Sequence, residues 1–276
     1  MSQPPPEDPQ VDRVLAEQPE QRFVGERDLT HWPSAVGAAL ARAAHRLRRR
    51  LAPHWVLLVT LGIGLALTVV LAALVATVYD AVTDVDGVAV LDRPALRTAM
   101  ALRTPVGNAV AATYAEVGGT VGMPILATLV AVGLAVAWRQ WTPVLLVAVT
   151  AAGSLALTVV GKGIVGRVRP PLADAVPPYE YGASFPSGHT LNSIAIAGIV
   201  AYLLVRRSHS RRARLLTVTL AGAFAFTMGM SRVYLGAHWL TDVLVAWALG
   251  AAWLTVVITA HRLLLTVRSP HERVRP

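Results

Sequence analysis

The chain has 276 residues, of which 54% are hydrophobic and 15% are charged. A soluble domain of this length needs more charge to cover its surface, so the composition excludes an ordinary soluble protein and indicates several membrane spans of about 20 apolar residues each. The net charge of +9 comes from arginines beside apolar runs, which argues against a nucleic-acid partner, and the absence of cysteine excludes disulfides, thiolate metal sites and cysteine nucleophiles.

The N-terminal region has two parts. Residues 1–33 are rich in proline, glutamate and glutamine, and because such a composition cannot bury a core, we expect a disordered cytoplasmic tail. Residues 34–54 have the pattern of a basic amphipathic helix that lies on the membrane surface. A basic flank for the first membrane span is the alternative interpretation of the same arginines.

Apolar runs predict an all-α membrane domain over residues 55–265, followed by a basic cytoplasmic tail over 266–276. The expected fold is a six-transmembrane-helix bundle with the amphipathic interfacial helix before it. A further interfacial helix is expected near 92–103, in the long segment after the first span. The six expected spans are 55–79, 117–138, 142–161, 189–205, 215–232 and 239–261.

The positions of the arginines predict the orientation of this bundle. Five arginines lie between residues 42 and 50, directly before the first span, and five more lie between the fourth and fifth spans. Arginine-rich loops stay in the cytoplasm, so both termini are expected there, in a multi-pass protein of the plasma (inner) membrane. The loops after the first, third and fifth spans then face outward.

Polar residues that do not suit a membrane span gather at the outward ends of these spans. Three are cations without matching acids, which favours a multiply charged anion such as phosphate as the ligand. The start of the fourth span adds free backbone N–H groups and the positive end of a helix. The residues are Lys162, Arg169, Ser187, Gly188, His189, Arg232, His238 and Asp242.

Two histidines and one aspartate in this set suggest catalysis. His238 and Asp242 are four residues apart, so on a helix they share a face. A carboxylate bound to one imidazole nitrogen leaves the other free to attack, which makes His238 the candidate nucleophile for a phosphoryl group. His189 is the candidate acid for the leaving oxygen, and the base for the water that later cleaves the phosphohistidine.

We expect no metal and no cofactor, because there is no carboxylate cluster and nearby cations oppose a zinc site made from the two histidines and the aspartate. Each residue also has a structural interpretation. His189 suits an interfacial helix cap, His238 an aromatic belt, and Asp242 an ion pair with Arg232. Glu116 is a further candidate for the site, although an interfacial role is favoured for it.

Three stretches also form a pattern that resembles the type 2 phosphatidic acid phosphatase superfamily. "KGIVGRVRP" (162–170) matches K-x6-R-P, "PSGH" (186–189) matches the second motif, and "SRVYLGAHWLTD" (231–242) matches S-R-x5-H-x3-D. The resemblance covers residues 162–242 closely and implies an all-helical core, metal-independent cleavage of a phosphomonoester or diphosphate, and a phosphohistidine intermediate.

The resemblance also implies residue roles. It makes His238 the nucleophile, His189 the acid and Asp242 the orienting carboxylate. It assigns phosphate binding to Lys162, Arg169, Ser187, Gly188 and Arg232. The chain departs from many members after the third-motif histidine, where they have Tyr-Pro, and again after the aspartate, where they have glycine. The residues at these places are Trp239, Leu240 and Ala246, which bear on lipid fit more than on chemistry.

The sequence thus predicts an integral membrane lipid phosphatase whose site faces outward. Its expected partners are the membrane and a lipid phosphate within it, and the sequence identifies no protein partner. Polyprenyl diphosphate is the first expected substrate, because recycling of a carrier lipid needs an outward-facing phosphatase, followed by phosphatidate or phosphatidylglycerophosphate. The alternatives are a lipid phosphotransferase that uses the same intermediate and a non-catalytic phospholipid-binding protein.

Overall fold

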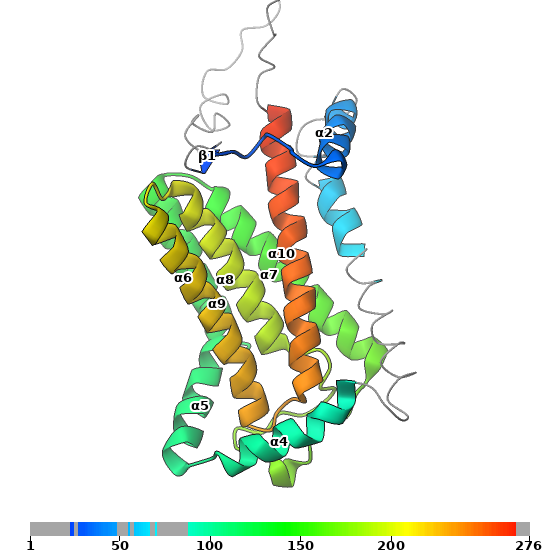
Figure 1. The fold of residues 1–276 in the computed structure, drawn as a ribbon, viewed down its shortest axis with the longest axis vertical. Coiled ribbons are helices and arrows are strands. Elements are labelled where there is room, and N and C mark those ends of the chain that lie inside the picture. The colour runs from blue at the N-terminus through cyan, green and yellow to red at the C-terminus, as the bar shows by residue number, and fades with distance from the viewer. Residues whose placement is uncertain are drawn as a thin grey trace, which may run out of the picture.

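The computed structural model describes residues 23–24, 27–48, 55, 58–66, 70 and 88–268, and this part of the chain is almost entirely helical. The exception is a short antiparallel pair, β1 (Phe23–Val24) and β2 (Arg27–Asp28). The helices, drawn in Figure 1, are α2 (Ala35–Arg48), η2 (Val88–Leu91), α4 (Asp92–Ala101), α5 (Pro105–Gly118), α6 (Gly122–Trp138), α7 (Thr142–Val165), η3 (Leu172–Asp174), α8 (Gly188–Arg207), α9 (Arg211–Tyr234) and α10 (Leu240–Arg268).

Four helices, α7, α8, α9 and α10, are long and apolar enough to cross a membrane. A fifth candidate is the pair α5 and α6, which meet at a short break with a bend of 55°. The first expected span, 55–79, lies largely outside the described residues, although 55, 58–66 and 70 are described and are helical. Within the described residues there are thus four or five candidate spans, and the count of six stays a prediction.

The break between α5 and α6 is the main departure from the expected spans, because 117–138 was predicted as one helix after a loop. Thr104 caps α5 by accepting the backbone N–H of Gly107 at 3.0 Å, and a proline follows it at the first helical position. At the break, a Cβ on Gly122 would lie 2.0 Å from the carbonyl oxygen of Glu116. Glycine therefore permits the close turn that separates the two helices.

All four long helices extend beyond the ranges that their apolar patterns predict. α8 spans Gly188–Arg207 instead of 189–205, and α9 spans Arg211–Tyr234 instead of 215–232. α7 begins at Thr142 as expected but continues to Val165. Gly166 is its C-cap residue, and its φ of 59° terminates the helix. Lys162 therefore lies in the last turn of a helix rather than in the loop after it. α10 continues past the expected end at residue 261 to Arg268.

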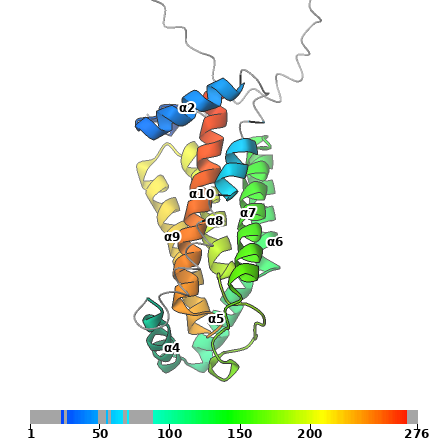
Figure 2. The ribbon, with the colours of Figure 1, turned by 90° about the vertical axis from the view of Figure 1, so that its right-hand side faces the viewer.

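The core of the bundle is built around α8, which lies beside α7, α9 and α10 in Figures 1 and 2. One stripe of α8 with four-residue spacing is at most 1% exposed, namely Leu191, Ala195, Ile199 and Leu203. Between α7 and α10, a Cβ on Gly153 would lie 2.1 Å from the ring of Trp253, and that ring donates its N–H to the carbonyl oxygen of Thr150 at 3.0 Å. Small residues at such contacts let membrane helices pack closely.

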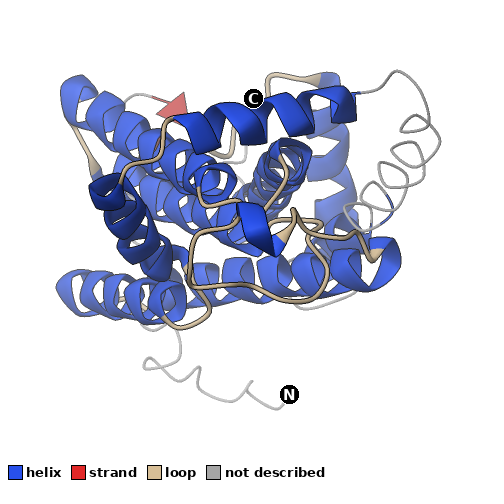
Figure 3. Cartoon of the chain, turned by 90° about the horizontal axis from the view of Figure 1, so that it is seen from below, coloured by secondary structure: helices blue, strands red, loops and turns tan. Residues whose placement is uncertain are grey.

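The bundle has different segments at its two ends. α4, which matches the helix expected near 92–103, lies at one end, and α2 lies at the other (Figure 2). Figure 3 views the molecule from the α4 end and shows the loops that join the helices there. The candidate site lies at this end.

The disordered tail expected over 1–33 stays a prediction, and residues 1–22, 25 and 26 of it lie outside the described part, whereas residues 29–32 of it contact α10. The indole N–H of Trp32 donates to the hydroxyl of Thr266 at 3.1 Å, and the guanidinium of Arg262 lies 4.2 Å from the Trp32 ring centroid. These contacts attach the segment to the extended end of α10. The helix expected over 34–54 is described as α2, and its position on a membrane surface stays a prediction.

Candidate active site

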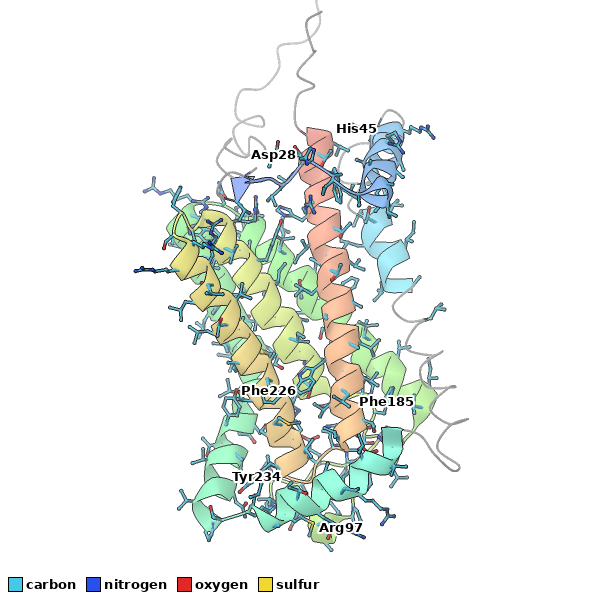
Figure 4. All side chains as sticks on the ribbon, viewed as in Figure 1. Asp28, His45, Arg97, Phe185, Phe226 and Tyr234 are labelled. Carbon is cyan, nitrogen blue, oxygen red and sulfur yellow. The ribbon has the colours of Figure 1, made fainter. Side chains whose placement is uncertain are left out.

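The residues expected to form a site come from six separate segments that meet at the α4 end of the bundle. Lys162 lies in the last turn of α7, and Arg169 lies in the loop that follows. Ser187, Gly188 and His189 lie at the start of α8. Arg232 lies in the last turn of α9, His238 in the loop between α9 and α10, and Asp242 in the first turn of α10. The loop from α7 to α8 is fixed by Phe185, labelled in Figure 4, whose side chain is 1% exposed. The motif residues are therefore close in space as well as ordered in sequence.

His238 is held in the short loop between α9 and α10. Gly236 in this loop has a φ of 69°, and a Cβ there would lie 2.5 Å from the carbonyl oxygen of Asp174, so glycine is required for the turn. The backbone N–H groups of Ala237 and His238 both donate to the carbonyl oxygen of Arg232, at 3.0 and 3.3 Å. The loop therefore ties the position of His238 to the end of α9.

Each ring nitrogen of His238 lies close to charged side chains. Nδ1 lies 3.5 Å from Oδ2 of Asp242, and Nε2 lies 3.2 Å from the Nη1 atom of Arg169. Both His238 and Asp242 are at most 1% exposed. A carboxylate that faces Nδ1 favours the tautomer whose Nε2 lone pair is free, and that atom points toward the cations.

Two residues that the sequence analysis did not select hold Asp242 in place. Arg167 donates from Nη1 to Oδ1 of Asp242 at 2.5 Å and from Nη2 to Oδ2 of Asp92 at 2.6 Å. The expected structural alternative, an ion pair between Asp242 and Arg232, is therefore wrong. Arg167 lies within "KGIVGRVRP", at a position that the family motif leaves open, and Asp92 is the first acid of the helix expected near 92–103.

The start of α8 differs in part from expectation. Ser187 lies at the N-cap position but makes no side-chain cap; its hydroxyl instead accepts a hydrogen bond from Thr190 at 2.9 Å. A Cβ on Gly188 would lie 3.1 Å from the side chain of Thr158, so this glycine also allows α7 and α8 to approach. The first backbone N–H groups of α8 have no partner within the helix, as at any helix start.

The cations expected to bind phosphate also shape the loop between α7 and α8. Lys162 donates to the carbonyl oxygen of Ala183 at 2.7 Å. Arg169 donates to the carbonyl oxygens of Gly182 and Ala237 at 3.2 and 2.7 Å. We use the term cradle for Lys162, Arg169, Arg232 and the first turn of α8.

An acid lies inside the cradle, which corrects the expectation of three cations without matching acids. Glu180 forms ion pairs with Arg232 through Oε1 and with Arg169 through Oε2, the latter at 2.9 Å. Its carboxylate is also 3.7 Å from Nδ1 of His189 and 3.6 Å from Nε2 of His238. The only sequence signal for this residue is a single acid shortly before the "PSGH" motif.

The surroundings of Glu180 keep it ionised. Burial raises the pKa of its carboxyl, but the proximity of His238 and the positive charge of Arg232 outweigh burial and hold that pKa well below its usual range. Glu180 therefore carries a negative charge throughout the neutral range. Glu116, the other acid considered for the site, is exposed on α5.

The described residues include no group of three histidine, cysteine, aspartate or glutamate side chains that could hold a metal ion. The carboxylates at the site are paired with arginines, and these cations would repel a metal. The arrangement of cations around a histidine suits a bound anion.

Two cavities between the helices differ in their distance from the site. One, of about 420 Å³, runs between α6, α7 and α8 and is lined mostly by apolar residues, with Gly119, Thr120, Thr128 and Asn192. A Cβ on Gly119 would lie 3.6 Å from Nε2 of His189, so this cavity begins beside the site. The other, of about 490 Å³, lies between α8, α9 and α10 and is lined by residues such as Tyr202, Gly222 and Trp247.

Comparison with known proteins gives a consistent result. The family profile described as the PAP2 superfamily matches residues 143–264, a range that contains every residue of the expected site. Phosphatidylglycerophosphatase B of Bacillus subtilis (strain 168) is 31% identical over 159 residues, which are 57% of this chain and 77% of that protein. A crystal structure of a transmembrane PAP2 type phosphatidylglycerolphosphate phosphatase from Bacillus subtilis is similar with a TM-score of 0.61 and 28% identity, over 69% of this chain and 94% of that one.

Proposed function

The chain belongs to the PAP2 superfamily and is a multi-pass membrane phosphatase, and from this premise we propose that it hydrolyses the phosphomonoester of a glycerophospholipid through a phosphohistidine at His238. The observation that carries the proposal is the position of His238. Its Nδ1 faces Asp242 at 3.5 Å, and its Nε2 faces the guanidinium of Arg169 at 3.2 Å. A nucleophile placed at a cation cradle is what transfer of a phosphoryl group requires.

The first chemical step transfers the phosphoryl group to the enzyme. Phosphate oxygens take the place of the Glu180 carboxylate between Arg169 and Arg232. Nε2 of His238 attacks phosphorus and forms a P–N bond while the ester P–O bond breaks. His189 in its protonated form gives a proton to the leaving alkoxide, and the cations and α8 N–H groups stabilise the charge on the equatorial oxygens.

The second step releases phosphate. Water attacks the phosphorus of the phosphohistidine, and His189, now neutral, accepts a proton from that water. The P–N bond breaks, its electron pair returns to Nε2, and inorganic phosphate leaves. Asp242 keeps Nδ1 of His238 in one orientation through both steps.

The substrate class follows from the cavity and from the similar proteins. An apolar cavity of about 420 Å³ that begins beside His189 suits the hydrocarbon chain of a lipid whose phosphate is in the cradle. Both similar Bacillus proteins are named for phosphatidylglycerophosphate, so we place that lipid first, with phosphatidate next. Polyprenyl diphosphate, which the sequence analysis placed first, becomes the second class of substrate.

We further propose that the site faces the extracytoplasmic side. The arginine-rich segment between α8 and α9 lies at the opposite end of α8 from His189. Because arginine-rich loops stay in the cytoplasm, the cradle is assigned to the outer face and both termini to the cytoplasm.

The test is release of phosphate by the purified protein from phosphatidylglycerophosphate, phosphatidate and polyprenyl diphosphate, each with excess EDTA. We expect the highest kcat/KM with the glycerophospholipid and no effect of EDTA, because protein cations do the electrostatic work. Activity that depends on zinc or magnesium would contradict metal-independent chemistry. If phosphate is released from none of the lipids, the alternative of a non-catalytic phospholipid-binding protein is favoured.

Two variants test the residue roles in the same assay. His238→Ala should abolish turnover, because no other group near the cradle accepts the phosphoryl group. His189→Ala should lower kcat by about 100-fold or more, the usual scale for loss of a general acid. Wild-type rates in His238→Ala would reject the nucleophile. A phosphorylated alcohol formed when glycerol is added would instead indicate a phosphotransferase.

A further inference from the structure

Arg167 lies between two carboxylates that come from distant parts of the chain. Its Nη1 and Nη2 atoms are 2.5 Å from Oδ1 of Asp242 and 2.6 Å from Oδ2 of Asp92. The side chain of Arg167 is 15% exposed, that of Asp92 is 4% exposed, and that of Asp242 is fully buried. A buried arrangement of this kind differs from a solvated surface pair, because removal of one member leaves a charge without compensation.

Asp92 also connects α4 to the beginning of α10. Its Oδ1 accepts the backbone N–H of Thr241 at 2.9 Å, and its Oδ2 accepts the hydroxyl of the same residue at 2.8 Å. An N–H group in the first turn of a helix has no partner within the helix, so Asp92 acts as a cap that another helix supplies. Thr241 directly precedes Asp242, and the position of Asp92 therefore affects the backbone that carries Asp242.

We propose that Asp92 and Arg167 are positioning residues that orient Asp242 and, through it, the imidazole of His238. Both oxygens of Asp242 have fixed donors. Oδ1 accepts from Arg167, and Oδ2 accepts the backbone N–H of Trp239 at 3.0 Å. These donors fix the plane of the carboxylate so that Oδ2 faces Nδ1 of His238. The inference rests on the proposed role of His238 as the nucleophile.

The residue types suit this role. The planar guanidinium of Arg167 presents separate N–H groups to two carboxylates at once, which a lysine ammonium does not reproduce. The ring of Trp239 lies 5.6 Å from the guanidinium carbon of Arg167 and covers it. Arg167 is paired with Asp92 as well as with Asp242, so it neutralises the charge of Asp242 only in part. The remaining negative charge on Asp242 stabilises the positive charge that develops on His238 as Nε2 attacks.

The first test uses two substitutions that change the network with little change in volume, Asp92→Asn and Arg167→Lys. We expect kcat to fall by about 10- to 100-fold, the scale found for residues that orient a reacting side chain. KM and the inhibition constant of orthovanadate should stay within about threefold, because neither residue belongs to the cradle. A rise in KM with unchanged kcat would overturn the proposal.

A double-mutant cycle with Asp242→Asn then separates positioning from general stability. If Asp92 and Arg167 act through Asp242, each substitution should lower kcat far less in the Asp242→Asn background than in the wild type. Equal losses in both backgrounds would reject the proposal. If His238→Ala or Asp242→Asn has no effect on turnover, the proposed function fails instead.

A matched control is Arg103→Lys. Arg103 is another arginine at this end of the bundle, and it donates to the backbone carbonyl oxygens of Tyr234 and Asp174 at 2.9 and 2.8 Å. Its effect on kcat should combine multiplicatively with that of Asp242→Asn. If Arg167→Lys does not fold, as shown by loss of a thermal transition, the same cycle is completed with Asp92→Asn, whose amide keeps an acceptor for Thr241.

Discussion

Glu180 and Arg232 form an ion pair inside the cradle, next to the proposed nucleophile. The same carboxylate is 2.9 Å from Arg169 and 3.6 Å from Nε2 of His238. A phosphate bound by both arginines and attacked by His238 has to occupy this position. Substrate binding is then an exchange of one anion for another, in which Glu180 leaves its two arginines.

This exchange predicts that Glu180→Gln binds phosphate analogues more tightly than the wild type. The amide keeps the size of the side chain but carries no charge to compete with the incoming anion. We expect the inhibition constant of orthovanadate to fall by about tenfold, which corresponds to about 1.4 kcal/mol. The measurement is competitive inhibition of lipid hydrolysis at fixed pH and ionic strength.

Asp174→Asn is the control for this experiment, because it removes one negative charge from the same loop. The backbone of Asp174 accepts from Arg103, and no ion pair joins its carboxylate to the cradle among the described residues. Its inhibition constant should stay close to that of the wild type. Equal or weaker inhibition of Glu180→Gln would show that Glu180 does not compete with substrate.

Glu180 should also affect how stability depends on pH. Its pKa is held below its usual range in the folded protein, so its carboxylate stabilises the fold above the unfolded value of about 4.3, and this contribution is lost as pH falls below that value. Glu180→Gln should therefore have a lower Tm than the wild type at neutral pH. The difference should be constant above about pH 5 and shrink toward pH 3.5.

Thermal unfolding in detergent across this pH range provides the measurement. Added orthovanadate should raise the Tm of Glu180→Gln more than that of the wild type, since it restores an anion between Arg169 and Arg232. A Tm difference that grows on acidification would contradict the assignment of a low pKa to Glu180.

The pattern of apolar runs was sufficient to predict α7, α8, α9 and α10, because each contains a long and predominantly apolar stretch. It did not predict α5, whose start depends on the local cap by Thr104 and on Pro105 rather than on periodicity. The pattern also places the end of α7 at residue 161, whereas the helix continues to Val165 and contains Lys162 in its last turn. A polar residue at the end of an apolar run can lie in the last turn of the helix or in the loop after it, and the pattern alone does not distinguish these positions.

The clustering of the motif residues could be predicted, because their types at this spacing indicate phosphate chemistry. The positions of Asp92, Arg167 and Glu180 could not, because each contacts partners far away in the sequence. Asp92 is paired with Arg167, and Glu180 with Arg232, across loops whose course only the tertiary structure defines. Single acids in loops carry no periodicity from which such contacts can be read.

The cavity between α6, α7 and α8 predicts an effect of substrate chain length. Ala152 on α7 is exposed and lines this cavity, so Ala152→Leu should narrow it. We expect KM for a dipalmitoyl substrate to rise by about tenfold, in line with about 1–3 kcal/mol for overpacking. KM for a dioctanoyl substrate should change much less, because its short chains reach less of the cavity.

Gly222→Leu provides the matched control in the other cavity. A Cβ at Gly222 meets no atom within 4 Å, and the cavity it lines lies between α8, α9 and α10. This variant should leave the ratio of the two KM values unchanged. If Gly222→Leu changes the ratio and Ala152→Leu does not, the lipid chain lies in the α8–α9–α10 cavity instead.

The orientation of the bundle gives the last prediction, and the two ends of α8 provide the labelling positions. α8 has 20 residues, about 30 Å at 1.5 Å per residue, which matches the thickness of the hydrocarbon core. Ala173 in η3 is exposed at the end that carries the cradle, and Ser210 is exposed before α9 at the other end. Because the chain has no cysteine, Ala173→Cys and Ser210→Cys each introduce a single thiol.

A membrane-impermeant thiol reagent on intact cells should label Ala173→Cys at once and Ser210→Cys only after lysis. The physical reason is the arginine content of the segment around Ser210, which retains that loop in the cytoplasm. The reverse pattern would place the cradle on the cytoplasmic face, where it meets lipids of the inner leaflet and cannot serve recycling of a carrier lipid outside. Labelling of both positions on intact cells would show that α8 does not cross the membrane, and the proposed arrangement of spans would then be wrong.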